Sequence, residues 1–100
     1  MTQDKPLVKA IDHCSLIVAD THKALEFYKG ILGLELDDSR PDLGYPGAWL
    51  RITNGQIHLL ELPNPYPVGN RPEHGGRDRH LALPVSDVTT IIQRLDKANI

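Results

Sequence analysis

The chain has 100 residues, which is enough for one domain, and its stability margin should be thin because short chains bury small cores. Hydrophobic residues make up 40% of the sequence and charged residues 24%, a balance that excludes disordered and fibrous proteins. The net charge of -2 provides no basic face for phosphate groups, so we expect no nucleic-acid partner.

We expect no secretory signal at the start of the given sequence. Residues 1–9 contain no apolar stretch of secretory length. No apolar run in the sequence approaches the roughly 18 residues that a membrane-spanning helix requires, so we expect no membrane role. The single cysteine, Cys14, cannot form an internal disulfide. These features predict a cytoplasmic protein.

A strand followed by a helix is predicted for residues 11–33. Residues 11–18 are rich in apolar and β-branched side chains, which favours a strand. Asp20 or Thr21 can accept the free N–H groups of a helix start, and Gly33 supplies a left-handed stop. Between them, apolar side chains recur at helical spacing: Ala24, Leu25, Tyr28, Ile31 and Leu32. The helix therefore has one face to bury.

Three further strands are predicted after this helix, at residues 34–38, 47–53 and 56–62. The last two are separated by Asn54-Gly55, a pair that favours a two-residue type I′ hairpin turn with positive φ at both positions. The first part of the chain therefore predicts a β-α-β-β-β module. Residues 63–78, rich in proline and glycine and without periodicity, are interpreted as a linker rather than as an active-site lid.

An internal repeat links the two ends of the chain. The pattern H-x-x-L-x-V-x-D occurs at residues 13–20 and again at residues 80–87. In the second copy Ser86 or Asp87 is the expected helix cap, and the apolar stripe that follows is Val88, Ile91, Ile92, Leu95 and Ala98. We predict a single α+β domain over residues 1–100 built from paired βαβββ modules. Its parts are module one (about 8–62), the linker (63–78) and a module two truncated after its first strand and helix (79–100).

Three side chains form a candidate metal site. His13 and His80 hold the same position in the two copies, and strand alternation turns both away from the helix. Glu61 lies between Leu60 and Leu62, where a carboxylate is costly to desolvate unless a cation or a donor meets it. Two imidazoles and a carboxylate match sites for Fe, Mn, Ni, Co or Zn. The simpler interpretation is that both histidines are packed strand residues and that Glu61 faces solvent.

Other polar and aromatic residues have simpler roles open to them. His58 alternates onto the face opposite Glu61 and is expected to pack or to meet solvent. Trp49 and Arg51 share a strand face, and they either shape the pocket or serve as a core residue and a surface charge. His74, in the linker, is expected to be solvated.

The residues above resemble the glyoxalase/bleomycin resistance/dioxygenase group, the vicinal oxygen chelate superfamily. The similarity runs from residue 11 to residue 100 through I-D-H-C-S-L-I-V-A-D, A-L-E-F-Y-K-G-I-L-G-L-E-L, I-H-L-L-E-L and D-R-H-L-A-L-P-V-S-D. It implies two βαβββ modules forming a cup around one divalent metal ion. By similarity to glyoxalase I, His13, Glu61 and His80 are three ligands, with Glu61 the candidate catalytic carboxylate. The fourth ligand, a glutamate in the last strand of module two, would lie beyond Ile100.

The resemblance leaves two classes of function open. The first is a metal-dependent enzyme, a lyase like glyoxalase I or an oxidoreductase like the extradiol dioxygenases, in which the metal chelates adjacent oxygens of a small substrate. In the dioxygenase arrangement Glu61 would line the pocket instead of binding the metal. The second is a metal-free binding protein that resembles the bleomycin resistance proteins. In either case we expect a homodimer.

Overall fold

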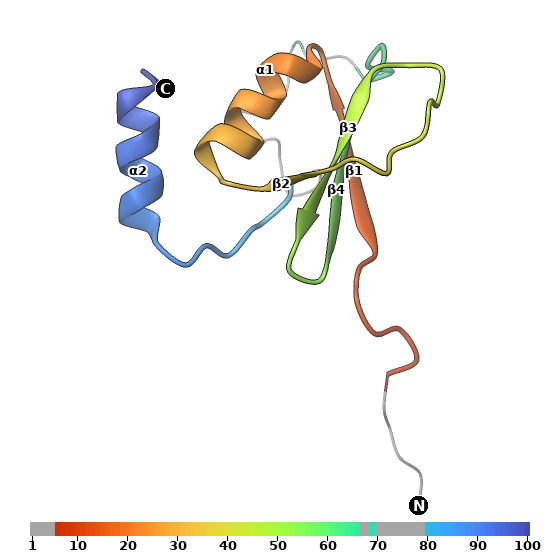
Figure 1. Cartoon of the computed structure of the whole chain (residues 1–100), viewed down its shortest axis with the longest axis horizontal. Helices are drawn as coiled ribbons and strands as arrows, with labels where there is room; N and C mark the ends of the chain where they lie inside the picture. The colour runs from red at the N-terminus through yellow and green to blue at the C-terminus, as the bar shows by residue number, and fades with distance from the viewer. Residues whose placement is uncertain (1–5, 67–68, 70–79) are drawn as a thin grey trace, which may run out of the picture. The chain divides into compact units, whose positions relative to one another are not determined.

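The computed structural model describes residues 6–66, 69 and 80–100 (Figure 1). The chain divides into two compact units, Met1–Pro63 and Asn64–Ile100, which are described in turn as unit 1 and unit 2. Within the described residues, no helix is long and apolar enough to cross a membrane.

Unit 1 has the predicted β-α-β-β-β order. Its helical segment follows the first strand, and the other three strands come after it. The elements are β1 (His13–Val18), α1 (Thr21–Leu25), η1 (Glu26–Ile31), β2 (Glu35–Asp37), β3 (Gly47–Ile52) and β4 (Gly55–Glu61). They form one four-stranded sheet in the order β1-β4-β3-β2, with β1 parallel to β4 and the other neighbours antiparallel. The α+β module expected from the sequence is confirmed.

The helical segment begins and ends where the sequence predicts. The Asp20 side chain accepts a hydrogen bond from the Lys23 backbone N–H at 3.1 Å, which caps α1. Gly33 has φ 77°, the left-handed conformation that stops a helix. The second half, η1, is a π-helix, and the Leu32 N–H continues this wider winding by donating to the Phe27 carbonyl.

The core of unit 1 lies on one face of the sheet. Alternate residues of β3 and β4 point to this face, and one residue of η1 joins them. The buried apolar side chains are Ile31, Ala48, Leu50, Ile57 and Leu59, of which Leu50, Ile57 and Leu59 are almost fully inaccessible. The opposite face is therefore free to carry polar side chains.

The β3–β4 turn differs from the expected type. Pairing continues to Ile52 opposite Gly55, so the two turn residues are Thr53 and Asn54. Neither Asn54 nor Gly55 has a positive φ, and a type I′ turn over this pair is therefore wrong. Gly55 instead belongs to β4, where its backbone passes close to the chain that leads into β1. A Cβ atom at Gly55 would lie 2.6 Å from the Ile11 carbonyl oxygen.

Gly55→Ala should therefore destabilise the protein by about 1–3 kcal/mol, because the backbone before β1 must move to admit a methyl group. Gly30→Ala is the matched control. Apart from its chain neighbours and the backbone of its own helix, nothing lies within 4 Å of the Cβ position at Gly30, and alanine in a helix should stabilise by about 0.4–1 kcal/mol. Urea unfolding of both variants measures the difference, and equal stabilities would contradict the close approach at Gly55.

Unit 2 contains the second predicted helix without the second predicted strand. The helix α2 spans Val88–Lys97, and Asp87 caps it by accepting from the Thr90 backbone N–H at 3.1 Å. Residues 80–87 form no strand in the structure, so the strand expected there is wrong. The physical reason is that a strand exists only by pairing, and no strand within the described residues pairs with this segment. Most of the expected linker lies outside the described residues.

The cap of α2 should make this helix sensitive to acid. The Thr90 hydroxyl and then the Thr90 N–H donate to Asp87, which holds the pKa of this carboxyl below its ordinary value. A depressed pKa means that the carboxylate stabilises the helix above the ordinary value near 3.8 and that this contribution is lost as pH falls further. The Thr90 amide shift measured by NMR should report this titration. Asp87→Asn keeps a capping oxygen but carries no charge, so the pH-dependent change of the Thr90 shift should vanish. If the change persists, it reports the titration of a group other than Asp87.

Candidate metal-binding face

The strand register distributes the side chains of unit 1 between the two faces of the sheet. β1 and β4 pair with His13 opposite Gln56 and Ser15 opposite His58. Paired residues on neighbouring strands point to the same face, and successive residues alternate. β3 extends this face, since Trp49 lies opposite His58. We call the face that carries these five residues the histidine face; it is opposite the apolar core.

Three aromatic rings stack across the histidine face. The His13 and His58 ring centroids are 4.1 Å apart at an interplanar angle of 13°, and the His58 and Trp49 centroids are 4.4 Å apart at 8°. His58 thus lies between the other two rings, and it is buried, with 9% of its surface exposed. Trp49, for which the sequence left a pocket role open, belongs to this face.

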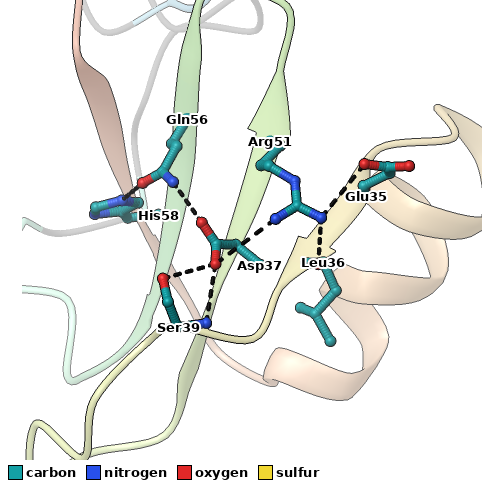
Figure 2. A network of polar contacts seen from close by, with 7 residues as sticks. All are labelled: Glu35, Leu36, Asp37, Ser39, Arg51, Gln56 and His58. Atoms are coloured by element: carbon teal, nitrogen blue, oxygen red, sulfur yellow. Dashed lines mark hydrogen bonds and ion pairs between the residues drawn. The ribbon is translucent and has the colours of Figure 1, made fainter.

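Each imidazole in the stack has one nitrogen engaged and one nitrogen left over. His13 Nδ1 lies 2.8 Å from Asp12 Oδ2, and the His13 side chain is 43% exposed. Since a carboxylate only accepts, a neutral His13 ring donates from Nδ1 and keeps its lone pair on Nε2. His58 Nε2 lies 2.7 Å from Gln56 Oε1 (Figure 2). An amide oxygen also only accepts, so the lone pair of a neutral His58 ring is on Nδ1.

The environment keeps His58 uncharged at neutral pH. Burial of the ring, followed by the charge of the adjacent His13, lowers the pKa of His58 below its ordinary value near 6.5, against the weaker opposing effect of Asp12 and Asp37. The positive charge of Arg40 acts in the same direction as burial. A neutral imidazole is the form that binds a metal ion.

Glu61 lies on the other face of the sheet. It pairs with Val18 at the end of β4, five positions along the register from Gln56, the partner of His13. Glu61 Oε1 accepts a hydrogen bond from the Thr21 backbone N–H at 2.7 Å. The structure therefore does not bring Glu61 and His13 together, and it shows this carboxylate holding the first residue of α1.

The remaining predicted ligand, His80, is an exposed residue of unit 2. Among the residues that the structure describes, no group of three His, Cys, Asp or Glu side chains is close enough to hold a metal ion. His74, expected to be a solvated loop residue, lies outside the described residues. Of the histidines predicted or considered as candidates, the structure brings together His13 and His58.

His58 was not predicted as a site residue, because strand periodicity gives only part of the information needed to find it. Strand alternation alone places His58 opposite Glu61, but it does not say which of these two faces carries His13. That assignment needs the β1–β4 register, in which His13 lies opposite Gln56 and hence on the same face as His58. A register is a relation between two strands, and periodicity within each strand does not specify it.

The donor set on the histidine face fits a divalent transition metal. His13 Nε2 and His58 Nδ1 are both lone-pair nitrogens whose ring partners are hydrogen-bonded, the arrangement found in metal-binding histidines. Imidazole suits Zn, Cu, Fe and Ni. The rings are nearly parallel, so both lone pairs can reach one ion only if a ring turns. His13 is the more exposed of the two rings and has the freedom to do so.

The sequence matches the Glyoxalase/Bleomycin resistance protein/Dioxygenase superfamily over residues 10–100. The chain therefore belongs to this superfamily. Its βαβββ unit, with β1 parallel to β4, is the architecture that the resemblance implied.

Two relatives show how the chain compares with longer proteins. "Glyoxylase I 4" of Arabidopsis thaliana is 25% identical over 92 residues, covering 91% of this chain and 52% of that protein. The mitochondrial methylmalonyl-CoA epimerase of Homo sapiens is 25% identical over 95 residues, covering 90% of this chain and 54% of that protein. The chain thus spans about half the length of the curated relatives that it matches.

Several solved structures share the fold at low sequence identity. A protein from Bacillus anthracis assigned to the glyoxalase family superposes with a TM-score of 0.70 at 22% identity, over 95% of this chain and 74% of that one. The antibiotic-binding protein TnmS3 from Streptomyces sp. CB03234 gives 0.66 at 21% identity, over 94% and 74%. A lactoylglutathione lyase from Agrobacterium tumefaciens gives 0.56 at 19% identity, over 93% and 72%. These likenesses support the fold.

Proposed function

We propose that this chain is the metal-binding part of a superfamily enzyme that acts on a small substrate with two adjacent oxygen atoms. The observation that carries the proposal is the pair of stacked imidazoles, His13 and His58, each with one lone-pair nitrogen free. His80, which repeats the His13 motif, is the proposed ligand from module two. The ion would supply Lewis-acid polarisation of the substrate oxygens, as in a glyoxalase-like lyase or a dioxygenase-like oxidoreductase.

The chain's own residues would have distinct roles in this site. His13 and His80 bind the ion, and His58 replaces Glu61 as the third donor because it lies on the same face as His13. The Asp12 carboxylate holds the His13 tautomer. Trp49 covers one face of His58 and excludes water from it. Glu61 is then a positioning residue for α1 and is not the catalytic carboxylate.

Assembly as a homodimer in the cytoplasm belongs to the same proposal. In the described part of the chain, β1 is an edge strand of the unit 1 sheet. The backbone N–H and C=O groups on its outer side could therefore pair with a strand of another molecule. A second copy is the partner that we expect there. Light scattering of the purified protein should give twice the mass of one chain, and a monomer at micromolar concentration would contradict this part.

A second candidate function is metal-free binding of a planar small molecule. It is favoured by the ring stack, because Trp49 is only partly buried and ring faces attract flat aromatic ligands. The antibiotic-binding neighbour TnmS3 has the same fold. In this alternative the three stacked side chains would act as a platform, and neither histidine would bind an ion.

Elemental analysis separates the two functions. The enzyme proposal expects about one transition metal per chain in the purified protein. His13→Ala and His80→Ala should each lose it, while His22→Ala, an exposed histidine of α1 with 87% of its side chain accessible, should retain it. Wild-type protein that stays metal-free after incubation with Zn²⁺, Ni²⁺, Mn²⁺ and Fe²⁺ would overturn the enzyme proposal and favour the binding protein.

A further inference from the structure

A chain of hydrogen bonds connects the edge strand β2 to the buried imidazole on β4. Gln56 Nε2 lies 2.7 Å from Asp37 Oδ2, and Gln56 Oε1 lies 2.7 Å from His58 Nε2 (Figure 2). The three side chains come from neighbouring positions on the histidine face: Asp37 on β2 pairs with Trp49, which pairs with His58. Gln56 thus bridges the Asp37 carboxylate and one nitrogen of the His58 ring.

Asp37 determines which group donates and which accepts in each of these hydrogen bonds. Asp37 Oδ1 accepts from the Ser39 backbone N–H at 2.9 Å and from Ser39 Oγ at 2.7 Å, and Arg51 Nη1 lies 3.8 Å from it. A carboxylate can only accept, so Gln56 must present its NH₂ group to Asp37. The Gln56 amide oxygen then faces His58, and His58 Nε2 must donate.

We propose that Asp37 and Gln56 are positioning residues that fix His58 as the Nε2–H tautomer and leave Nδ1 as its free donor atom for a divalent metal. The metal part of this statement rests on the proposed function. The tautomer itself does not, because it follows from the polarity of the hydrogen bonds in the metal-free protein. Orienting partners of this kind determine which nitrogen of a histidine meets an ion.

Asp37→Asn should reverse the direction of both hydrogen bonds, the one between Asp37 and Gln56 and the one between Gln56 and His58. The Ser39 N–H is an obligate donor, so the oxygen of the introduced amide stays at the Oδ1 position and its NH₂ group turns to Gln56. Gln56 must then flip, accept from that NH₂ group and donate to His58. His58 Nε2 becomes an acceptor and the proton moves to Nδ1. The substitution keeps size and shape; it reverses which groups donate and removes the negative charge beside Arg51.

NMR of ¹⁵N-labelled, metal-free protein at about pH 8, where an imidazole is neutral, tests the tautomer directly. The unprotonated ring nitrogen resonates well downfield of the protonated one, and its couplings to the ring protons identify it as Nδ1 or Nε2. We expect Nδ1 unprotonated in the wild type and Nε2 unprotonated in Asp37→Asn. Glu35→Gln is the matched control: Glu35 approaches Arg51 at 3.4 Å but does not contact Gln56 or His58, so the wild-type pattern should remain.

Gln56→Met provides an independent test of the tautomer if Asp37→Asn does not fold. Methionine matches glutamine in length and has no amide, so His58 should lose its preference and show a mixture of tautomers. Protonated Nδ1 in the wild type, or an unchanged Nε2–H tautomer in both variants, overturns the proposal.

Metal titration separates this proposal from the proposed function. With the tautomer reversed, Asp37→Asn should bind Ni²⁺ or Zn²⁺ about 10- to 100-fold more weakly, the usual cost of losing an orienting partner. A reversed tautomer with unchanged metal affinity would confirm that Asp37 and Gln56 set the tautomer, and it would show that His58 is not a metal ligand. A wild-type protein that binds no metal would contradict the proposed function and leave the tautomer result intact.

Discussion

His58→Phe should lose at least about 10- to 100-fold in affinity for Ni²⁺ or Zn²⁺. Losing only the hydrogen-bond partner of a metal ligand typically costs this much, and losing the ligand itself should cost no less. Phenylalanine preserves a flat ring between His13 and Trp49, so the stack and the fold should survive while the donor nitrogen is lost. Isothermal titration calorimetry measures the affinity, and circular dichroism checks the fold.

Two control variants make the His58 result specific. His22→Phe removes an exposed imidazole of α1 and should leave the affinity unchanged. Glu61→Gln keeps an oxygen that can accept from the Thr21 N–H and should also bind metal normally. If Glu61→Gln loses the metal and His58→Phe keeps it, the ligand set lies on the other face of the sheet.

Leu50→Ala should be the most destabilising single substitution in the core, with a loss of about 2–5 kcal/mol in the free energy of unfolding. Its side chain has no exposed surface, and a protein of this size has only about 5–15 kcal/mol to lose. Urea unfolding followed by Trp49 fluorescence measures the loss. Leu43→Ala, at a side chain that is 42% exposed, should change stability by less than about 0.5 kcal/mol. Similar losses at both positions would contradict the placement of the core on β3 and β4.

The elements of module one could be predicted from the sequence because each depends on local chemistry. Asp20 caps a helix wherever its side chain can reach the free N–H groups, and Gly33 stops one because it accepts a positive φ. The turn between β3 and β4 could not be predicted in the same way. Asn54-Gly55 favours one turn type locally, but the strand register moves the turn to Thr53 and Asn54 and keeps Gly55 for a close backbone contact.

The site was predictable in part for the same physical reason. His13 was identified because its motif repeats at His80, a pattern within the sequence. Its neighbour His58 is found only through the pairing of β1 with β4, which connects residues more than forty positions apart. The hydrophobic neighbours of Glu61 did indicate that its carboxylate needs a partner, and in the structure that partner is the Thr21 N–H.

Paramagnetic NMR shows most directly whether a metal binds on the histidine face. A small amount of Mn²⁺ added to ¹⁵N-labelled protein broadens the signals of the amides nearest to the ion. Binding at His13 and His58 should broaden Ser15 and the Trp49 indole N–H, which lie on the same face of the sheet, and should spare Thr21. Broadening centred on Thr21 and Glu61, or none at all, would contradict a metal site built on the two stacked imidazoles.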